Sequence, residues 1–160
     1  MGSGKTTIGR LLAERLGWRQ RDNDAGLAAM TGETARELNE RLGVSALHRL
    51  EAADLLAALQ ETDRTVISAA SSVIEDPTCR EALQAPGIVV VWLRADPAIL
   101  AERIRTMSHR PELAADVANL LERQRVTRDP LYASVADIAV EAGDRPPETI
   151  VEEIVHALPA

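Results

Sequence analysis

The chain opens with a glycine-rich segment that also carries a cation and three hydroxyls, Gly2-Ser3-Gly4-Lys5-Thr6-Thr7. Gly2 and Gly4 have no Cβ, so the backbone N–H groups around them can turn inward and surround an anion. Lys5 adds a positive charge that can follow a transferred phosphoryl group, and the Thr6 hydroxyl is placed to ligate Mg²⁺. We therefore expect this segment to bind the phosphates of ATP together with Mg²⁺.

The segment matches the second half of the Walker A pattern, including its Gly-Lys-Thr core. Apolar residues follow it at helical spacing, namely Ile8, Leu11, Leu12 and Leu16. The predicted helix turns its positive end toward the phosphates, and it disfavours the alternative of a flexible linker. The full pattern also needs a first glycine five positions before Gly4 and a strand that enters the cradle. We expect both to be missing from this chain, through a misassigned start or a real loss.

Strands and helices alternate along the rest of the chain. The clearest strand is predicted at residues 88–93, an apolar run between Pro86-Gly87 and Asp96-Pro97. Shorter strands are predicted at 18–21, 65–70 and 137–140, a loop at 107–115, and helices at 8–16, 28–42 (one or two), 44–59, 77–83, 97–106, 116–127 and 148–158. Such alternation implies a parallel sheet with helices on both faces. The predicted fold class is therefore α/β, a three-layer sandwich.

Composition narrows the function classes. The chain has 160 residues, 46% hydrophobic and 27% charged, so we expect one globular domain over residues 1–160. A formal net charge of −7 argues against a broad nucleic-acid or anionic-membrane surface. No apolar run approaches the roughly 18 to 20 residues that span a bilayer, so the cytoplasm is the expected location. Cys79 is the single cysteine and the three histidines show no ligand spacing, which gives no support for a zinc or iron protein.

Two aspartates, Asp22 and Asp24, follow the strand predicted at residues 18–21. A hard cation prefers carboxylate oxygen, and a hydroxyl nucleophile needs a nearby acceptor for its proton. The pair is therefore a candidate site for a metal ion and a hydroxylated substrate. The alternative is an ordinary turn in which an aspartate caps a helix.

Together these features resemble the shikimate kinase family, from Gly2 to about Val155. The resemblance rests on the cradle followed by Ile8-Gly9-Arg10-Leu11-Leu12-Ala13, and on Asp22-x-Asp24 at 17 and 19 residues after Lys5. It implies a P-loop NTPase-type fold and transfer of the γ-phosphate of ATP to a hydroxyl of a small metabolite. It also implies that Asp22 serves the Mg²⁺ shell, and that Asp24 contacts the acceptor hydroxyls as a candidate general base.

The resemblance extends to residues that would bind the acceptor. His48, with Arg49 beside it, falls where the family carries an arginine that grips the acceptor's carboxylate. Ala70-Ser71-Ser72 takes the place of three glycines that approach the acceptor, so we expect the Ser71 and Ser72 hydroxyls to contact a sugar-like or polyol substrate. Arg128, in the run Arg128-Asp129-Pro130-Leu131-Tyr132, aligns with a further acceptor-binding arginine. The alternatives are a solvated helical face for the first pair and a plain turn for the serines.

Two more arginines are implied on the nucleotide side. Arg103 aligns with a helix arginine that packs on adenine. Arg110, before Pro111, aligns with a small lid at about residues 107–115, whose closure would exclude water as a competing acceptor. The expected catalytic residues are therefore Lys5, Asp24 and Arg110. The residues expected to bind ATP are Gly2, Ser3, Gly4, Lys5, Thr6, Thr7 and Arg103.

The acceptor itself is open at this stage. Shikimate is the leading candidate by resemblance, but His48 and Ala70-Ser71-Ser72 depart from the family's pattern. Loss of a bidentate clamp on a carboxylate changes discrimination by on the order of 100-fold. The alternatives are a kinase for a gluconate-, nucleoside- or nucleotide-type acceptor, and a non-catalytic nucleotide-binding relic. The sequence gives no expectation for an oligomeric partner.

Overall fold

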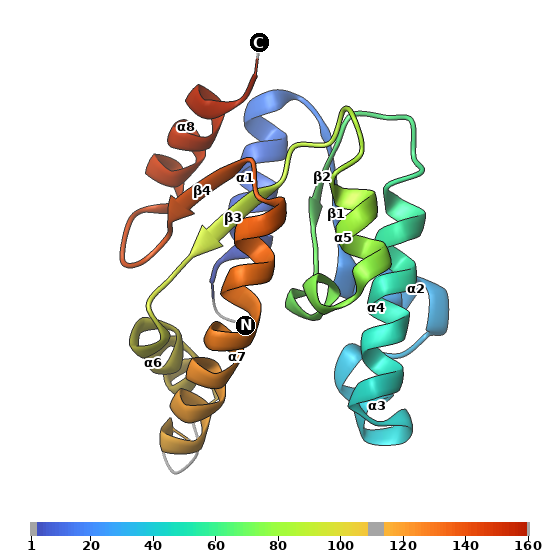
Figure 1. Cartoon of the computed structure of the whole chain (residues 1–160), viewed down its shortest axis with the longest axis vertical. Coiled ribbons are helices and arrows are strands. Elements are labelled where there is room, and N and C mark those ends of the chain that lie inside the picture. The colour runs from blue at the N-terminus through green and yellow to red at the C-terminus, as the bar shows by residue number, and fades with distance from the viewer. Residues whose placement is uncertain (1–2, 109–113, 160) are drawn as a thin grey trace. The chain divides into compact units, whose positions relative to one another are not determined.

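The computed structural model describes residues 3–108 and 114–159, without the side chains of residues 103–108, 114–116 and 118 (Figure 1). Its strands are β1 (Arg19–Asp22), β2 (Thr65–Ser68), β3 (Val91–Arg94) and β4 (Ile138–Glu141). Its helices are α1 (Lys5–Leu16), α2 (Asn23–Thr31), α3 (Ala35–Leu42), α4 (Val44–Ala58), the 3₁₀ helix η1 (Ser71–Glu75), α5 (Pro77–Leu83), α6 (Pro97–Ser108), α7 (Ala114–Val135) and α8 (Pro147–Ala157). The chain divides into two compact units: a first unit of residues 1–8 and 87–160, and a second unit of residues 9–86.

Two helices of the second unit begin at local sequence signals. Asp76 caps α5 by accepting from the Thr78 and Cys79 N–H groups, and Pro77 follows at the first helical position. Thr34 and Glu37 form a reciprocal capping box at the start of α3. These local bonds explain why short helices form where the chain has little apolar surface to bury.

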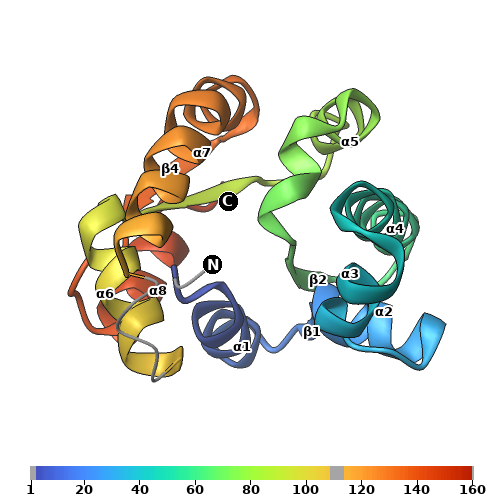
Figure 2. The same cartoon turned by 90° about the horizontal axis from the view of Figure 1, so that it is seen from below.

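The second unit is built on the parallel pair of β1 and β2, in register from Arg19↔Thr65 to Asp22↔Ser68. Figure 2 shows α2, α3 and α4 lying side by side, and α4 contacts both of the other helices. One buried cluster of this unit joins α4, η1 and α5 and consists of Ala52, Leu55, Val73 and Cys79. Ile67 of β2, together with Ala69 and Ala70 beyond its end, packs against this cluster, which holds the end of β2 next to α4.

The first unit is built on the parallel pair of β3 and β4, in register from Val91↔Ile138 to Arg94↔Glu141. Helix α8 packs on β4, where Val140, Ile150 and Ile154 are each about 1% exposed. Helices α6 and α7 pack against each other (Figure 1). Burial of these branched side chains supplies the apolar contact that holds the strand pair to α8.

The structure confirms the α/β fold class with parallel strands, and corrects the predicted bounds of one helix and one loop. The helix predicted at 116–127 is too short, because α7 runs from Ala114 to Val135 with Pro130 inside it. Pro130 has no N–H group, so the Val126 carbonyl loses its helical hydrogen-bond donor. Val126 is 68% exposed, so water can donate to this carbonyl instead. The loop predicted at 107–115 is also too long, since α6 reaches Ser108 and α7 begins at Ala114. Its remaining residues, 109–113, lie outside the described residues.

The four strands form two separate pairs, whereas a single parallel sheet was predicted. Within residues 3–108 and 114–159, β2 pairs with β1 alone and β3 with β4 alone. The described residues before α1 form no strand that could enter the cradle. In the same part of the chain, no helix combines the length and the apolar character that a membrane span requires. The expectation of one domain over residues 1–160 stays a prediction.

Candidate active site

Gly4 lies in the turn that leads into α1, with a φ of +83°. Residues with a side chain rarely adopt this left-handed conformation, whereas glycine does so at little cost. A Cβ built on Gly4 would lie 3.5 Å from Ile8 Cδ1, which is an ordinary contact. The position therefore requires glycine for its backbone angle rather than for lack of space. Gly2 lies outside the described residues.

Helix α1 begins at Lys5, so the N–H groups of its first turn have no acceptor inside the helix. Its first turn contains no acidic residue that would neutralise the positive end of the helix dipole. Lys5 Nζ donates to Ser3 Oγ over a long 3.5 Å, and Thr6 and Thr7 are exposed. An ammonium group and hydroxyls beside a positive helix end have the chemistry of a phosphate site.

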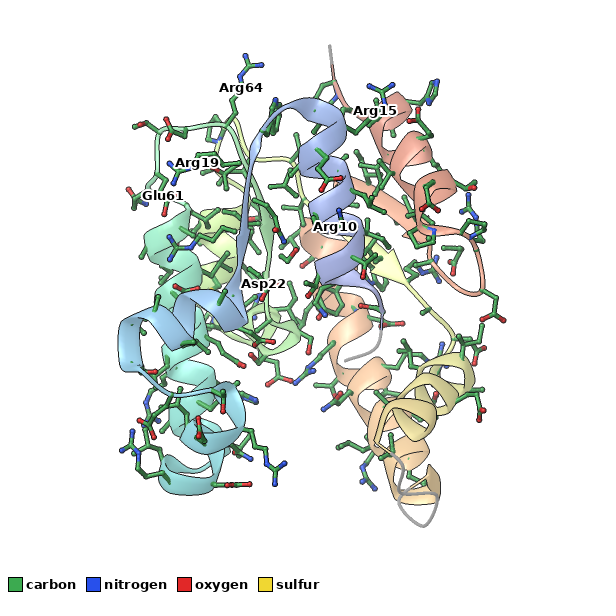
Figure 3. The ribbon with its side chains drawn as sticks, turned by 180° about the vertical axis from the view of Figure 1, so that it is seen from behind. Arg10, Arg15, Arg19, Asp22, Glu61 and Arg64 are labelled. Carbon is green, nitrogen blue, oxygen red and sulfur yellow. The ribbon has the colours of Figure 1, made fainter. Side chains whose placement is uncertain are left out.

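Asp22 is the last residue of β1, at the point where the chain turns into α2 (Figure 3). Its Oδ1 accepts a hydrogen bond of 3.0 Å from the Asp24 N–H, so Asp22 is the N-cap of α2. The helix-cap alternative for this pair is therefore present in the structure. Asp24 is exposed, and its carboxylate has no hydrogen bond or ion pair to the described part of the chain. This carboxylate is therefore available to a hydroxyl of a bound molecule.

Asn23 lies between the two aspartates and is only 3% exposed. Its side-chain oxygen accepts a hydrogen bond of 2.9 Å from the Ala70 N–H, two residues beyond the end of β2. Its side-chain nitrogen donates to Asp54 Oδ2 at 2.6 Å and, more weakly, to the Glu51 carbonyl oxygen at 3.4 Å. Asn23 therefore joins the carboxyl ends of β1 and β2 to helix α4.

Two carboxylates of α4, Glu51 and Asp54, are buried. They are three positions apart in the helix, so they project from the same face. The Ser72 hydroxyl, which is also buried, donates a hydrogen bond to the Glu51 carboxylate. Ser72 was predicted to contact the acceptor, and the structure gives its proton an internal partner. Only the hydroxyl oxygen of Ser72 then has capacity for a further bond.

Arg21 holds the other side of the Asp54 carboxylate. Its Nη2 lies 2.6 Å from Asp54 Oδ1, and its Nη1 pairs with Glu61. The hydrogen bond to Asp54 is the main cause of the raised pKa of Arg21. These residues line a groove of about 660 Å³ that runs beside β1, α2 and α4 and also includes Asp22. The Asp54 carboxylate is thus held from two sides, by Asn23 and by Arg21.

His48 and Arg49 project in different directions from α4. His48 is half-buried and stands one turn before Glu51 on the same face, whereas Arg49 is exposed. Neither side chain has a hydrogen bond or ion pair within the described residues. Ser71 is half-buried at the first position of η1. Of the predicted acceptor residues of this unit, Ser72 therefore bonds the buried Glu51, whereas His48 and Arg49 have no bond to this network in the described part of the chain.

Arg128 is buried in α7, with 7% of its surface exposed. One turn later, Tyr132 stacks on Trp92 of β3, with ring centroids 5.4 Å apart and an angle of 23° between the planes. The Arg94 guanidinium lies over the same Trp92 ring, 5.1 Å from its centroid. Burial raises the pKa of the neighbouring Asp129 carboxyl. These contacts anchor the part of α7 that carries Arg128 to β3.

Two predicted nucleotide-binding residues have no described side chain. Arg103 lies on α6, and Arg110 lies outside the described residues altogether. Their roles at the adenine ring and in the lid stay predictions.

The network around Asn23 was missed by sequence reasoning. Its partners Asp54 and Ala70 lie 31 and 47 residues away along the chain, and no local pattern reports such contacts. One signal was present: Asp54 stands three residues after Glu51 and beside Leu55, on the helix face that otherwise carries apolar residues. A carboxylate at such a position indicates a buried polar partner.

Comparison with known proteins gives one consistent result. A family model described as shikimate kinase matches residues 1–159. The shikimate kinase of Paramagnetospirillum magneticum is 36% identical over 159 residues, which cover 99% of this chain and 80% of that protein. The shikimate kinase of Pseudomonas syringae pv. tomato is 35% identical, with 99% and 91% covered.

Solved structures agree in fold. A shikimate kinase from Acinetobacter baumannii, in complex with shikimate, has a TM-score of 0.87 and 28% identity, covering 98% of this chain and 87% of that one. A gluconokinase from Sinorhizobium meliloti has a TM-score of 0.68 at 24% identity, with 98% and 86% covered, a likeness of fold alone. The predicted P-loop kinase fold is confirmed by these neighbours.

Proposed function

The chain belongs to the shikimate kinase family, and we propose that it transfers the γ-phosphoryl group of ATP to a hydroxyl of shikimate. The observation that carries this proposal is that membership extends over essentially the whole chain. The chain is a small-molecule kinase that uses ATP.

The start of α1 binds the phosphates of ATP in this proposal. Lys5 and the N–H groups of the first helical turn offer positive charge to the triphosphate. Phosphoryl transfer passes through a loose transition state, so catalysis consists mainly of positioning and charge stabilisation. We therefore assign Lys5 to the transferred group and propose that no covalent enzyme intermediate forms. Arg110 is the further cation that we expect to reach the phosphates.

Mg²⁺ fits the donors that the chain offers. Asp22 and Thr6 supply carboxylate and hydroxyl oxygen, the ligands that this hard cation prefers. We propose that these two residues hold the ion. When bound, Mg²⁺ neutralises the charge that develops between the β- and γ-phosphates.

Asp24 orients the acceptor hydroxyl and accepts its proton in the proposed reaction. Its carboxylate is exposed and has no partner within the described residues, so no internal bond must break before a substrate binds. A positioned general base contributes about 10²- to 10⁴-fold to the rate. A change at Asp24 should therefore lower kcat far more than it changes stability.

Recognition of the acceptor's carboxylate falls to Arg128 and His48. A guanidinium binds a carboxylate with two parallel hydrogen bonds, whereas an imidazole offers one. We therefore expect weaker capture of shikimate than in a relative that has arginine at both positions. The KM for shikimate, rather than kcat, should carry this difference.

The acceptor is tested with labelled ATP and Mg²⁺ against a panel of shikimate, gluconate, a nucleoside and a nucleotide. We expect label on shikimate, and we expect His48→Arg to lower its KM on the order of 10-fold, about the value of one charge-assisted hydrogen bond. Arg36→Ala is the matched control, because it removes an exposed cation of α3 that pairs with Glu40, and it should leave this KM unchanged. Transfer to another panel member would identify a different acceptor, and transfer to none would refute the proposed reaction.

A further inference from the structure

Asn23 makes three side-chain hydrogen bonds to residues distant in sequence, yet it stands between two proposed site residues. The β1–β2 ladder ends at the pair Asp22↔Ser68. Beyond that pair, the Asn23 oxygen accepts from the Ala70 N–H at 2.9 Å, as a backbone carbonyl would if the ladder continued. Asn23 thereby ties the backbone before Asp24 to the segment that enters η1.

The Asp54 carboxylate fixes the orientation of the Asn23 amide. With the nitrogen at 2.6 Å from Asp54 and the oxygen on the Ala70 N–H, both contacts are favourable. A flipped amide would set oxygen against the carboxylate and N–H against N–H, two repulsive contacts. Arg21, at 2.6 Å, holds the Asp54 charge in place from the other side. One orientation of Asn23 is therefore strongly favoured.

Helix α2 also presses on this carboxylate. A Cβ built on Gly26 would lie 2.5 Å from Asp54 Oδ1 and 2.6 Å from Oδ2. Asp54 has little room to move away, because Arg21 and Asn23 both hold it. The same α2 carries Asp24 in its first turn. The position of the Asp54 carboxylate and the position of α2 are therefore coupled.

Stability alone gives a weak reason for this arrangement. Replacing a buried ion pair by apolar side chains of similar volume is often neutral or stabilising. Buried polar groups instead select one geometry among several that apolar packing would tolerate. The geometry selected here is that of Asp24, whose own side chain has no partner within the described residues and whose direction depends on its backbone.

We propose that Asn23 and Asp54 are positioning residues that aim the Asp24 carboxylate at the acceptor hydroxyl. This inference rests on the proposed function, because it needs Asp24 to act in phosphoryl transfer. It predicts that loosening the Asn23–Asp54 bond affects transfer to the acceptor while binding of ATP is unaffected. Displacement of a catalytic group by about 1 Å costs on the order of 100-fold in rate.

The test compares Asn23→Ala, Asp54→Asn and Gly26→Ala with wild type in steady-state kinetics for ATP and shikimate. We expect Asn23→Ala to lower kcat at least about 10-fold. We expect a several-fold lower kcat in the two milder variants. Asp54→Asn keeps a side-chain oxygen that can accept from Asn23, and Gly26→Ala displaces the Asp54 carboxylate but leaves it in place chemically. The KM for ATP should stay within about twofold in all three. Glu61→Gln is the matched control, because it removes the exposed arm of the same Arg21 bridge and should leave kcat unchanged.

The outcomes distinguish a failure of the proposed function from a failure of the positioning role alone. If wild type phosphorylates no acceptor, the proposed function fails and the positioning role fails with it. If wild type is active and the folded variants keep its kcat, the positioning role alone is refuted. A fall in kcat that only follows the folded fraction, measured by circular dichroism at the assay temperature, would also refute it, as would an equal loss in Glu61→Gln.

Discussion

Gly9 of α1 lies so close to Ser68 of β2 that a single oxygen atom decides whether a larger residue fits. A Cβ built on Gly9 would lie 2.2 Å from Ser68 Oγ, far inside contact distance. The next atoms are Ser68 Cβ at 3.6 Å and Val66 Cγ1 at 3.9 Å, both ordinary contacts. Ser68 is buried, so its hydroxyl has little freedom to turn away. The clash expected in Gly9→Ala therefore involves the Ser68 hydroxyl alone.

Two opposing effects set the magnitude for Gly9→Ala. Overpacking lowers the free energy of unfolding by about 1–3 kcal/mol, whereas alanine in a helix interior raises it by about 0.5–1 kcal/mol. The net loss should be about 1–2 kcal/mol, and each kcal/mol corresponds to a fall in Tm of about 2–4 °C for a chain of this size. In a Ser68→Ala background the clashing oxygen is gone, so the same substitution should stabilise the protein by about 0.5–1 kcal/mol.

The assay is a double-mutant cycle in urea unfolding of wild type, Gly9→Ala, Ser68→Ala and the double variant. Other bonds of the Ser68 hydroxyl are lost on both sides of the cycle and cancel. We expect a coupling energy of about 2 kcal/mol between the two positions. If Gly9→Ala were equally destabilising with and without the Ser68 hydroxyl, the close approach of α1 to β2 would not be its cause, and the packing described for this unit would be wrong.

Three further predictions concern single residues. Asp24→Asn should lower kcat on the order of 100-fold or more with Tm nearly unchanged. Asp63→Asn, a change at an exposed aspartate, should change neither kcat nor Tm. Equal kcat values for the two variants would show that Asp24 does not act in the reaction. Gly4→Ala and Gly17→Ala, both at left-handed angles, should each lower the free energy of unfolding by about 1–2 kcal/mol, but only Gly4→Ala should raise the KM for ATP, and a rise in both would point to a global effect. Burial raises the pKa of Cys79 from 9.0 to about 11, so the folded state favours the protonated thiol, and its contribution is complete below pH 9 and lost between about pH 9 and 11. Wild type should therefore lose about 2 kcal/mol more than Cys79→Ala between pH 8 and pH 11, and parallel pH profiles in urea unfolding would contradict the burial of this thiol.

Local signals account for the elements that were predicted well. The helix expected at 77–83 matches α5, because Asp76 and Pro77 specify its start within the segment itself. The end of α7 was missed because Pro130 normally interrupts a helix, and the exposure that makes it tolerable here depends on how α7 packs. The strand predicted at 88–93 is shorter than expected, because strand pairing begins at Val91. The Val90 N–H instead donates to the carboxylate of Asp137, the residue before β4.

The candidate site was predictable where chemistry follows spacing along the chain. Asp22 and Asp24 were found from their distance to Lys5, and the glycine at position 4 from the motif. The contacts of Asn23 were not predictable, since they depend on parallel strands bringing Ala70 and α4 to the end of β1. The same applies to Ser72, whose bond to Glu51 follows from tertiary packing and changes what its hydroxyl can offer a substrate.

The most direct measurement of the central claim is the thermal unfolding of wild type and Lys5→Ala with and without ATP and Mg²⁺. Ligand at 100 times its Kd stabilises a protein by about 2.7 kcal/mol, which corresponds to a rise in Tm of about 5–11 °C for a chain of this size. We predict this rise for wild type, a smaller rise without Mg²⁺, and little or none for Lys5→Ala. No rise in wild type, or the same rise in Lys5→Ala, would contradict the assignment of the glycine-rich segment as the ATP site.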